Sequence, residues 1–225
     1  MFITSAMHLM VVLLLGGSMN INYIHWLGHA SFRIEDGKKE IYIDPWKISE
    51  ISPKADIILI THGHYDHFSP EDIAKIRTEK TILVAPKNIA GQIRGNIIAV
   101  EPGKTYEIGS LKVTTVPAYN INKKFHPKEN GWVGYIITLS NGERIYHSGD
   151  TDLIPEMKNI VADVAMMPCG GTYTMTATEM AKAANSFKPK ILIPIHWGDI
   201  VGSKADAEEV KKLYEGETVI LKPGR

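Results

Sequence analysis

The chain has 225 residues, is 44% hydrophobic and carries 25 basic and 25 acidic side chains. This length and hydrophobic content suit one sizeable domain. The formal net charge of zero predicts no basic surface for nucleic acid, and the charges are interspersed as on an ordinary solvated surface. The lone cysteine, Cys169, excludes an internal disulfide framework and a multi-thiolate zinc site, and we expect it to be buried rather than nucleophilic.

The first 18 residues form an apolar extension. Residues 7–17 read MHLMVVLLLGG, which is shorter than the about 20 residues of a membrane-spanning helix. Residues 1–8 contain no Lys or Arg, whereas a signal peptide would have a basic start. We therefore expect a domain over 19–225 behind an upstream extension over 1–18, no membrane partner and a cytoplasmic location. The apolar side of this extension is expected to pack on the body or to join subunits into an oligomer.

The chain then alternates short strands with helices. Strands are expected over 21–27, 31–35, 40–43, 56–60, 81–85, 97–100, 106–108, 112–116, 133–139, 144–147, 163–166, 191–195 and 218–221. Helices are expected from the Ser69-Pro70 start and over 87–94, 153–160, 176–187 and 204–214. Two strand-rich halves that each carry helices predict an α+β fold. Its two mixed β-sheets pack face to face with helices outside, as a single domain.

The segment Thr61-His-Gly-His-Tyr-Asp-His67 is the strongest chemical signal. His62 and His64 are two residues apart, so in an extended chain they point the same way and can bind one metal ion. Asp66 and His67 are adjacent, diverge, and can serve a second ion. Imidazoles and a carboxylate at this density suit zinc first, with manganese, iron or nickel as alternatives.

Further ligands are expected at the ends of other strands. His196 follows the apolar strand 191–195, and Asp150 follows the strand 144–147 with Gly149 to allow a bend. An aspartate there could bridge two cations and hold them about 3.5–4 Å apart. Each residue alone would be read as a turn or core-edge residue. The cluster at 62–67 needs partners, and this need favours the ligand interpretation.

Together these motifs resemble the metallo-β-lactamase fold superfamily. The sequences Trp26-Leu-Gly-His-Ala-Ser31 and Met167-Pro-Cys-Gly-Gly-Thr-Tyr-Thr-Met175 resemble its branch of metal-dependent hydrolases related to ascorbate-6-phosphate lactonase. The resemblance implies a four-layer αββα sandwich with a site for two divalent metal ions at one edge of the sheets. The ligands that it implies are His62, His64, Asp66, His67, Asp150 and His196, with Asp150 bridging.

One position departs from the superfamily pattern. Many relatives have a histidine soon after a Pro-Ala pair, but here Pro117-Ala-Tyr-Asn120 offers Asn120. We expect His126 to fold back across a short loop and complete the first metal's ligands. If it does not, the first ion is weakly held and a mononuclear enzyme is the alternative.

Other residues are candidates for supporting roles. Asp44 resembles the superfamily's aspartate that hydrogen-bonds a ligand histidine, with capping of the turn before Pro45 as the equal alternative. His29 is a candidate catalytic residue that contacts substrate or transfers a proton, with a structural role as the alternative. His147 is expected to be packed rather than a ligand. Candidates to line the pocket are Tyr173, Met175 and Trp197.

The expected activity is metal-dependent hydrolysis of a small molecule by a hydroxide that bridges the two ions, with Asp66 orienting it. A lactone or other ester is the first expectation for the substrate, from the lactonase resemblance, and a phosphodiester is the second. An iron-dependent oxidative enzyme of the same fold and a catalytically silent metal-binding protein are the alternatives. Metal analysis and a test of oxygen dependence would identify the oxidative enzyme, which should carry iron and need oxygen for activity.

Overall fold

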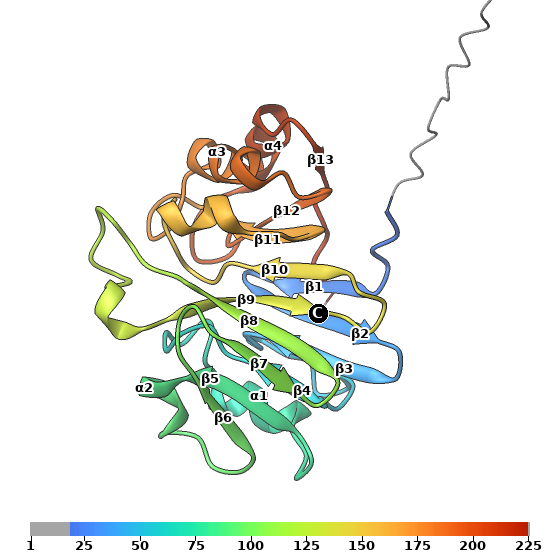
Figure 1. Ribbon diagram of the computed structural model, residues 1–225. Helices are drawn as coiled ribbons and strands as arrows, with labels where there is room; N and C mark the ends of the chain where they lie inside the picture. Colours follow the sequence, from blue (N-terminus) through green and yellow to red (C-terminus); the bar gives the residue numbers. More distant parts are fainter. Residues whose placement is uncertain (1–18, 225) are drawn as a thin grey trace, which may run out of the picture.

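The computed structural model describes residues 19–224 (Figure 1). The first half contains β1 (Ile24–Gly28), β2 (Ser31–Asp36), β3 (Lys39–Ile43), β4 (Ile57–Leu59), α1 (Pro70–Ile76), β5 (Ile82–Pro86), α2 (Lys87–Ala90) and β6 (Ile97–Val100). The second contains β7 (Thr105–Ile108), β8 (Leu111–Pro117), η1 (Lys128–Asn130), β9 (Val133–Thr138), β10 (Arg144–His147), η2 (Pro155–Asn159), β11 (Val164–Pro168), α3 (Ala177–Phe187), β12 (Ile191–Ile195), α4 (Lys204–Leu213) and β13 (Glu217–Thr218). The extension predicted over 1–18, and any subunit contact through it, lies outside the described residues.

The strands form two mixed sheets, as the sequence predicts. One sheet has the order β1-β2-β3-β4-β5-β6 and the other has the order β13-β12-β11-β10-β9-β8-β7. In the first, β1 to β3 pair antiparallel and β3 to β6 pair parallel. In the second, β7 to β10 pair antiparallel and β10 to β13 pair parallel. Each half of the chain therefore builds one sheet.

Three hydrophobic clusters separate the four layers of this αββα sandwich. The largest lies between the sheets and joins residues such as Ile34 and Leu59 of the first sheet to Ile137 and Ile193 of the second. A second cluster packs the outer face of the second sheet against α3 and α4, and a third packs the outer face of the first sheet against α1 and α2. Strands β4, β11 and β12 are buried along their whole length, because they are covered on both faces.

The helix starts follow the capping signals in the sequence. Ser69 accepts a hydrogen bond from the backbone of Asp72 at the start of α1, and Thr176 forms a capping box with Glu179 at the start of α3. Several predicted bounds are wrong. The helix over 87–94 is only four residues long, the helix over 153–160 is the 3-10 turn η2, and the last strand covers only 217–218.

The topology brings the predicted site segments to one edge of the sandwich. Strands β1, β3 and β4 run in the same direction in the first sheet, as do β8, β10, β11 and β12 in the second. Their carboxyl ends lie at the left in Figure 1. At this edge Val133 N–H donates to the carbonyl of Thr61, and His196 N–H donates to the carbonyl of His29. These two hydrogen bonds connect the two sheets at the edge where the candidate site residues lie.

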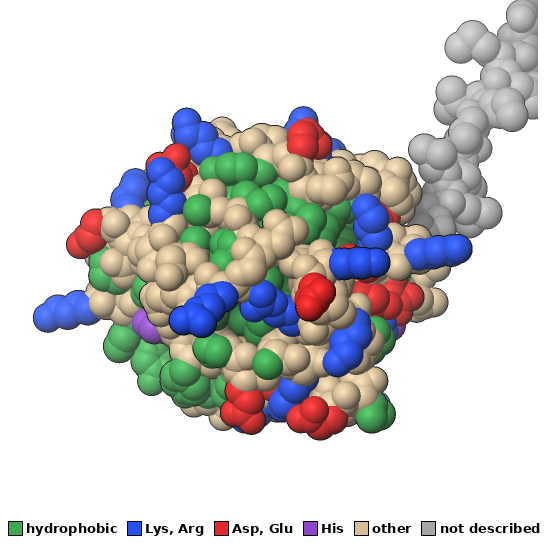
Figure 2. Space-filling view, turned by 90° about the horizontal axis from the view of Figure 1, so that it is seen from below, with side chains coloured by type: hydrophobic (Ala, Val, Ile, Leu, Met, Phe, Trp, Pro, Cys, Tyr) green, Lys and Arg blue, Asp and Glu red, His purple; other side chains and the backbone are tan. Residues whose placement is uncertain are grey.

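The surface agrees with the balanced composition. On the face drawn in Figure 2, Lys and Arg side chains are intermixed with Asp and Glu side chains. Among the helices of residues 19–224, none has the length and the apolar content needed to span a bilayer.

Candidate metal centre

His62, His64 and His126 form the first group of histidines at this edge. One ring nitrogen of each lies within 4.8 Å of the others. His62 Nε2 and His64 Nδ1 are 3.1 Å apart, and the rings of His64 and His126 have centroids 4.9 Å apart. The predicted return of His126 across its loop therefore takes place in the fold. Trp132, which sequence reasoning missed, packs against all three rings with centroids 5.0–5.6 Å away.

Asp44 orients two of the site histidines, His67 directly and His62 through Thr61. It is fully buried, and its Oδ2 lies 2.7 Å from Nδ1 of His67. The same carboxylate accepts hydrogen bonds from the backbone N–H of Thr61 at 2.7 Å and from its hydroxyl at 2.6 Å. The Thr61 hydroxyl lies 3.0 Å from Nδ1 of His62. Asp44 and the Thr61 hydroxyl thus face Nδ1 of the two rings, and the Nε2 atoms of His62 and His67 are the ones that face the other site residues.

Asn120 performs the same task for His126. Its Oδ1 accepts a hydrogen bond from the backbone N–H of His126 at 2.9 Å and lies 3.1 Å from Nδ1 of that ring. Its Nδ2 donates to Asp152 at 3.1 Å and to the carbonyl of Tyr173 at 3.0 Å. Asn120, which stands where many relatives have a histidine, thus orients His126, the histidine expected to supply that ligand instead. The sequence revealed the substitution but not this role.

Replacing Asn120 with Ala is expected to weaken binding of one metal ion about 10–100-fold, the usual cost of losing a residue that orients a ligand. His126 would lose both its ring partner and its backbone partner. Chelator competition on the metal-loaded protein measures this affinity. The control is Asn122→Ala, an exposed residue in the same loop. Equal affinities in the two variants would show that Asn120 does not position His126.

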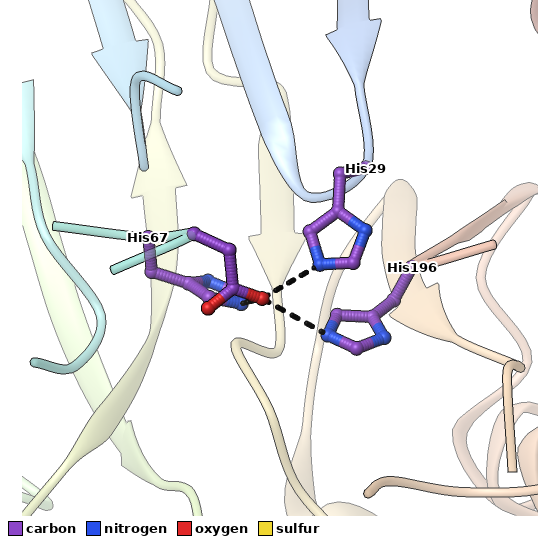
Figure 3. A group of neighbouring side chains, drawn as sticks. His29, His67 and His196 are labelled. Carbon is purple, nitrogen blue, oxygen red and sulfur yellow. Dashed lines mark hydrogen bonds and ion pairs between the residues drawn. The ribbon is translucent and has the colours of Figure 1, made fainter. Parts of the chain in front are cut away.

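A second group comprises His29, Asp66, His67 and His196. Their candidate ligand atoms lie within 4.8 Å of one another. Figure 3 shows the rings of His29, His67 and His196 turned toward one another from three separate parts of the chain. Asp66 Oδ2 lies 2.9 Å from Nε2 of His29, 3.7 Å from Nε2 of His67 and 3.9 Å from Nε2 of His196.

Asp150 lies between the two groups. Its Oδ2 is 3.2 Å from His126 Nε2 in the first group and 3.0 Å from His196 Nε2 in the second. Its Oδ1 is 3.4 Å from His67 Nε2. Gly149, with φ +60°, turns the chain before it; a Cβ at Gly149 would lie 3.0 Å from the side chain of Thr61. The predicted bend is thus what seats Asp150 between the sheets.

The residues fit a metal centre better than a network of hydrogen bonds. The Nε2 atoms of His67, His126 and His196, and Oδ1 of Asp150, are buried and make no hydrogen bond despite these short distances. Two ligands of one tetrahedral zinc ion, each bound at about 2.0–2.1 Å, lie roughly 3.3 Å apart. The observed separations of 3.0–3.4 Å around Asp150 match this spacing. Buried nitrogen and oxygen atoms that face a common point without forming hydrogen bonds to one another provide the arrangement that a bound cation requires.

The charge states also suit metal binding. Burial lowers the pKa of the His29 imidazole to about 4, so it is neutral and donates to Asp66. Burial alone would raise the pKa of Asp66, but the hydrogen bond from His29 and the charges of His67 and His29 together lower this pKa to about 2. His67 is the exception: burial lowers its pKa, yet the carboxylates of Asp150 and Asp44 raise it to about 9. A metal ion that binds His67 must therefore displace a proton.

Three of these residues have left-handed backbone conformations that only Gly adopts freely. The φ angles are +52° at His29, +45° at Asp44 and +59° at His196. Each follows the end of a strand, and each such conformation costs on the order of 1–3 kcal/mol. The surrounding hydrogen bonds hold them, including the bond from His196 N–H to the His29 carbonyl. Strain concentrated at one edge is typical of functional sites.

A cavity of about 230 Å³ opens onto both groups. It is lined by His64, Tyr65, Asp66, Phe125, His126, Asp150, Tyr173, His196 and Ile200. Of the predicted lining residues, Tyr173 is present. Met175 is instead fully buried in the core beneath α3, and Trp197 packs against Trp26 with the two rings tilted, beside a different hollow.

The remaining candidates are buried away from this cavity. The ring of His29 is fully buried; it contacts Asp66 but does not line this cavity. His147 is packed, with Nε2 2.8 Å from the carbonyl of Ala30. Cys169 is buried, as expected, and burial raises the pKa of its thiol well above the ordinary value.

Comparison with known proteins identifies the family. The model of the beta-lactamase superfamily domain matches residues 23–196, which run from before β1 to the histidine after β12. The chain belongs to this family. UPF0173 metal-dependent hydrolases of Methanopyrus kandleri and Pyrococcus abyssi are each 36% identical to it, over 89% of this chain and 97% and 96% of their own lengths. It is therefore a metal-dependent hydrolase of the metallo-β-lactamase fold.

Solved structures agree with this membership. A candidate metal-dependent hydrolase from Parabacteroides distasonis has a TM-score of 0.80 and 35% identity, with 90% of this chain and 93% of that chain covered. A metallo hydrolase from Ignicoccus hospitalis, at 24% identity and TM-score 0.73, covers 90% and 95% and shares the fold. Membership of this family favours an enzyme over the catalytically silent metal-binding protein.

Proposed function

We propose that this member of the metallo-β-lactamase family binds two divalent metal ions, zinc first, and hydrolyses a small carboxylic ester, lactones included. The observation that carries the proposal is Asp150, whose carboxylate lies 3.0–3.4 Å from imidazoles of both histidine groups. In this proposal His62, His64 and His126 would hold one ion and Asp66, His67 and His196 would hold the other, with Asp150 as a candidate ligand for both. Two such ions supply a water of lowered pKa and a positive charge for the developing oxyanion.

The protein's own groups would then position the reactants. Asp66 lines the cavity and is ionised, because its pKa is about 2, so it can accept a hydrogen bond from the attacking water. The Nε2 proton of His29 points at Asp66 Oδ2 and fixes that carboxylate, which makes His29 a positioning residue. The net reaction adds water across the ester: its oxygen bonds the acyl carbon, the carbon–oxygen bond to the alcohol breaks, and a proton ends on the alcohol oxygen.

The lining of the cavity supports an ester over a phosphodiester. Among the described residues that line it, none is Lys or Arg, so no side-chain cation faces a phosphate. An oxidative reaction at iron is the other alternative. The residue His64 argues against it, because di-iron oxygen reducers that the fold resembles have a glutamate at this position.

These functions are separated by one set of assays. The protein is stripped with a chelator, reloaded with zinc, manganese, nickel or iron, and its metal content is measured by mass spectrometry. We expect two ions per chain and hydrolysis of esters and lactones by the zinc form. Faster turnover of bis(4-nitrophenyl) phosphate than of every ester would favour the phosphodiesterase. Oxygen consumption by the iron form alone would favour the oxidative enzyme.

A further inference from the structure

We infer that the substrate carries a short, uncharged, apolar arm, which lies in the outer part of the cavity; this inference rests on the proposed ester hydrolysis. The outer lining residues are Tyr65, Phe125, Tyr173 and Ile200. They come from four separate loops at the carboxyl ends of strands of both sheets. Three of them are among the exposed large hydrophobic residues: Tyr65 is 67% exposed, Phe125 45% and Ile200 36%. Apolar side chains that gather from separate loops around a polar centre are typical of ligand sites.

The aromatic part of this lining is held in place. The rings of Phe125 and Tyr173 meet edge to face, with centroids 4.7 Å apart and planes at 89°. Asn120 fixes both of their loops, since it bonds the backbone of His126 next to Phe125 and the carbonyl of Tyr173. A preformed apolar wall costs little ordering when a ligand binds.

Two cations near this wall, Lys123 and Lys47, are paired with neighbouring carboxylates. Lys123 Nζ, two residues before Phe125, lies 2.6 Å from Asp152, and Lys47 Nζ lies 2.8 Å from Asp199, next to Ile200. Lys124 lines a different hollow. None of the described residues that line the cavity is Lys or Arg, so a negatively charged arm along this wall would lose its hydration without contacting a side-chain cation of the lining. The volume of about 230 Å³ is smaller than the roughly 300–1,000 Å³ of drug-sized pockets, so the arm is short.

The test uses trifluoroethyl esters of acetic, butyric and hexanoic acid, and the monoester of adipic acid, with the zinc-loaded protein. Adipate has the chain length of hexanoate but ends in a carboxylate. Full burial of each added methylene would raise kcat/KM about fourfold. Because the wall is half open, we expect kcat/KM at least about tenfold higher for hexanoate than for acetate, and at least about tenfold lower for the adipate ester than for hexanoate. Equal rates across the series, or preference for the adipate ester, would overturn the inference while leaving ester hydrolysis intact.

A variant and a binding assay separate the arm from the chemistry. Phe125→Ala is expected to reduce the ratio of kcat/KM for hexanoate over acetate by at least about threefold, while Val161→Ala, an exposed apolar residue at a distant loop, keeps it. Hydroxamates of the same four acids bind metal without being hydrolysed, and calorimetry gives their affinities. Tighter binding of the hexanoic than of the acetic and adipic hydroxamates, with no ester hydrolysed, would refute the proposed reaction and uphold the apolar arm. Equal affinities would refute the arm.

Discussion

Replacing Asp150 with Asn is expected to lower kcat/KM of the metal-loaded protein more than about 100-fold, beyond the usual cost of losing an outer-shell residue. The reason is its position: its two oxygens lie within 3.4 Å of histidines from both groups. An amide keeps the volume of the carboxylate but loses its charge and presents an N–H to imidazole nitrogens that donate electron pairs. At least one metal ion should therefore be missing from the purified variant.

The control for this variant is Asp36→Asn. Asp36 is also buried, but it caps the backbone of Ser140 at the opposite end of the strands. It should retain both ions and full activity. An Asp150→Asn protein that retains two ions and hydrolyses ester within about threefold of the wild-type rate would show that this carboxylate does not join the two groups.

The second large effect is expected at Asp44. Asp44→Asn should weaken metal binding about 10–100-fold, because the network that fixes His62 through Thr61 and His67 directly depends on this carboxylate. It should also lower the free energy of unfolding by about 1.5–3 kcal/mol, the range for losing a hydrogen bond to a charged group. Asn tolerates the left-handed backbone at this position, so strain is not the cause.

Chelator competition and urea denaturation of the metal-free protein measure these two quantities separately. If Asp44 only capped the turn before Pro45, stability would fall while metal affinity stayed at the wild-type value. That outcome would contradict its role beneath the histidines.

Local patterns predicted the parts of the site that depend on neighbouring residues. The spacing of His62, His64, Asp66 and His67 fixed how they divide between two groups, and the strand before each remaining segment indicated a common edge. The sandwich itself followed from two runs of strands, each with its own helices. These inferences hold because alternation and strand direction are set within a few residues.

The rest depends on contacts between distant segments. Asn120 looked like a missing ligand, because its bonds to His126 and Tyr173 exist only once two loops meet. The ring of His29 contacts Asp66 and also packs against His196, 167 positions later, with ring centroids 3.9 Å apart. The segment 153–160 has a helical pattern, but the structure forms only a short 3-10 turn there, Pro155–Asn159.

The most direct test of the two-metal centre is a crystal structure of the zinc-loaded protein with anomalous data collected on both sides of the zinc absorption edge. We expect two anomalous peaks about 3.5–4 Å apart. One should lie among His62, His64 and His126, the other among Asp66, His67 and His196, with Asp150 bound to both. A single peak, or a His126 ring turned away from the metal, would contradict the dinuclear centre.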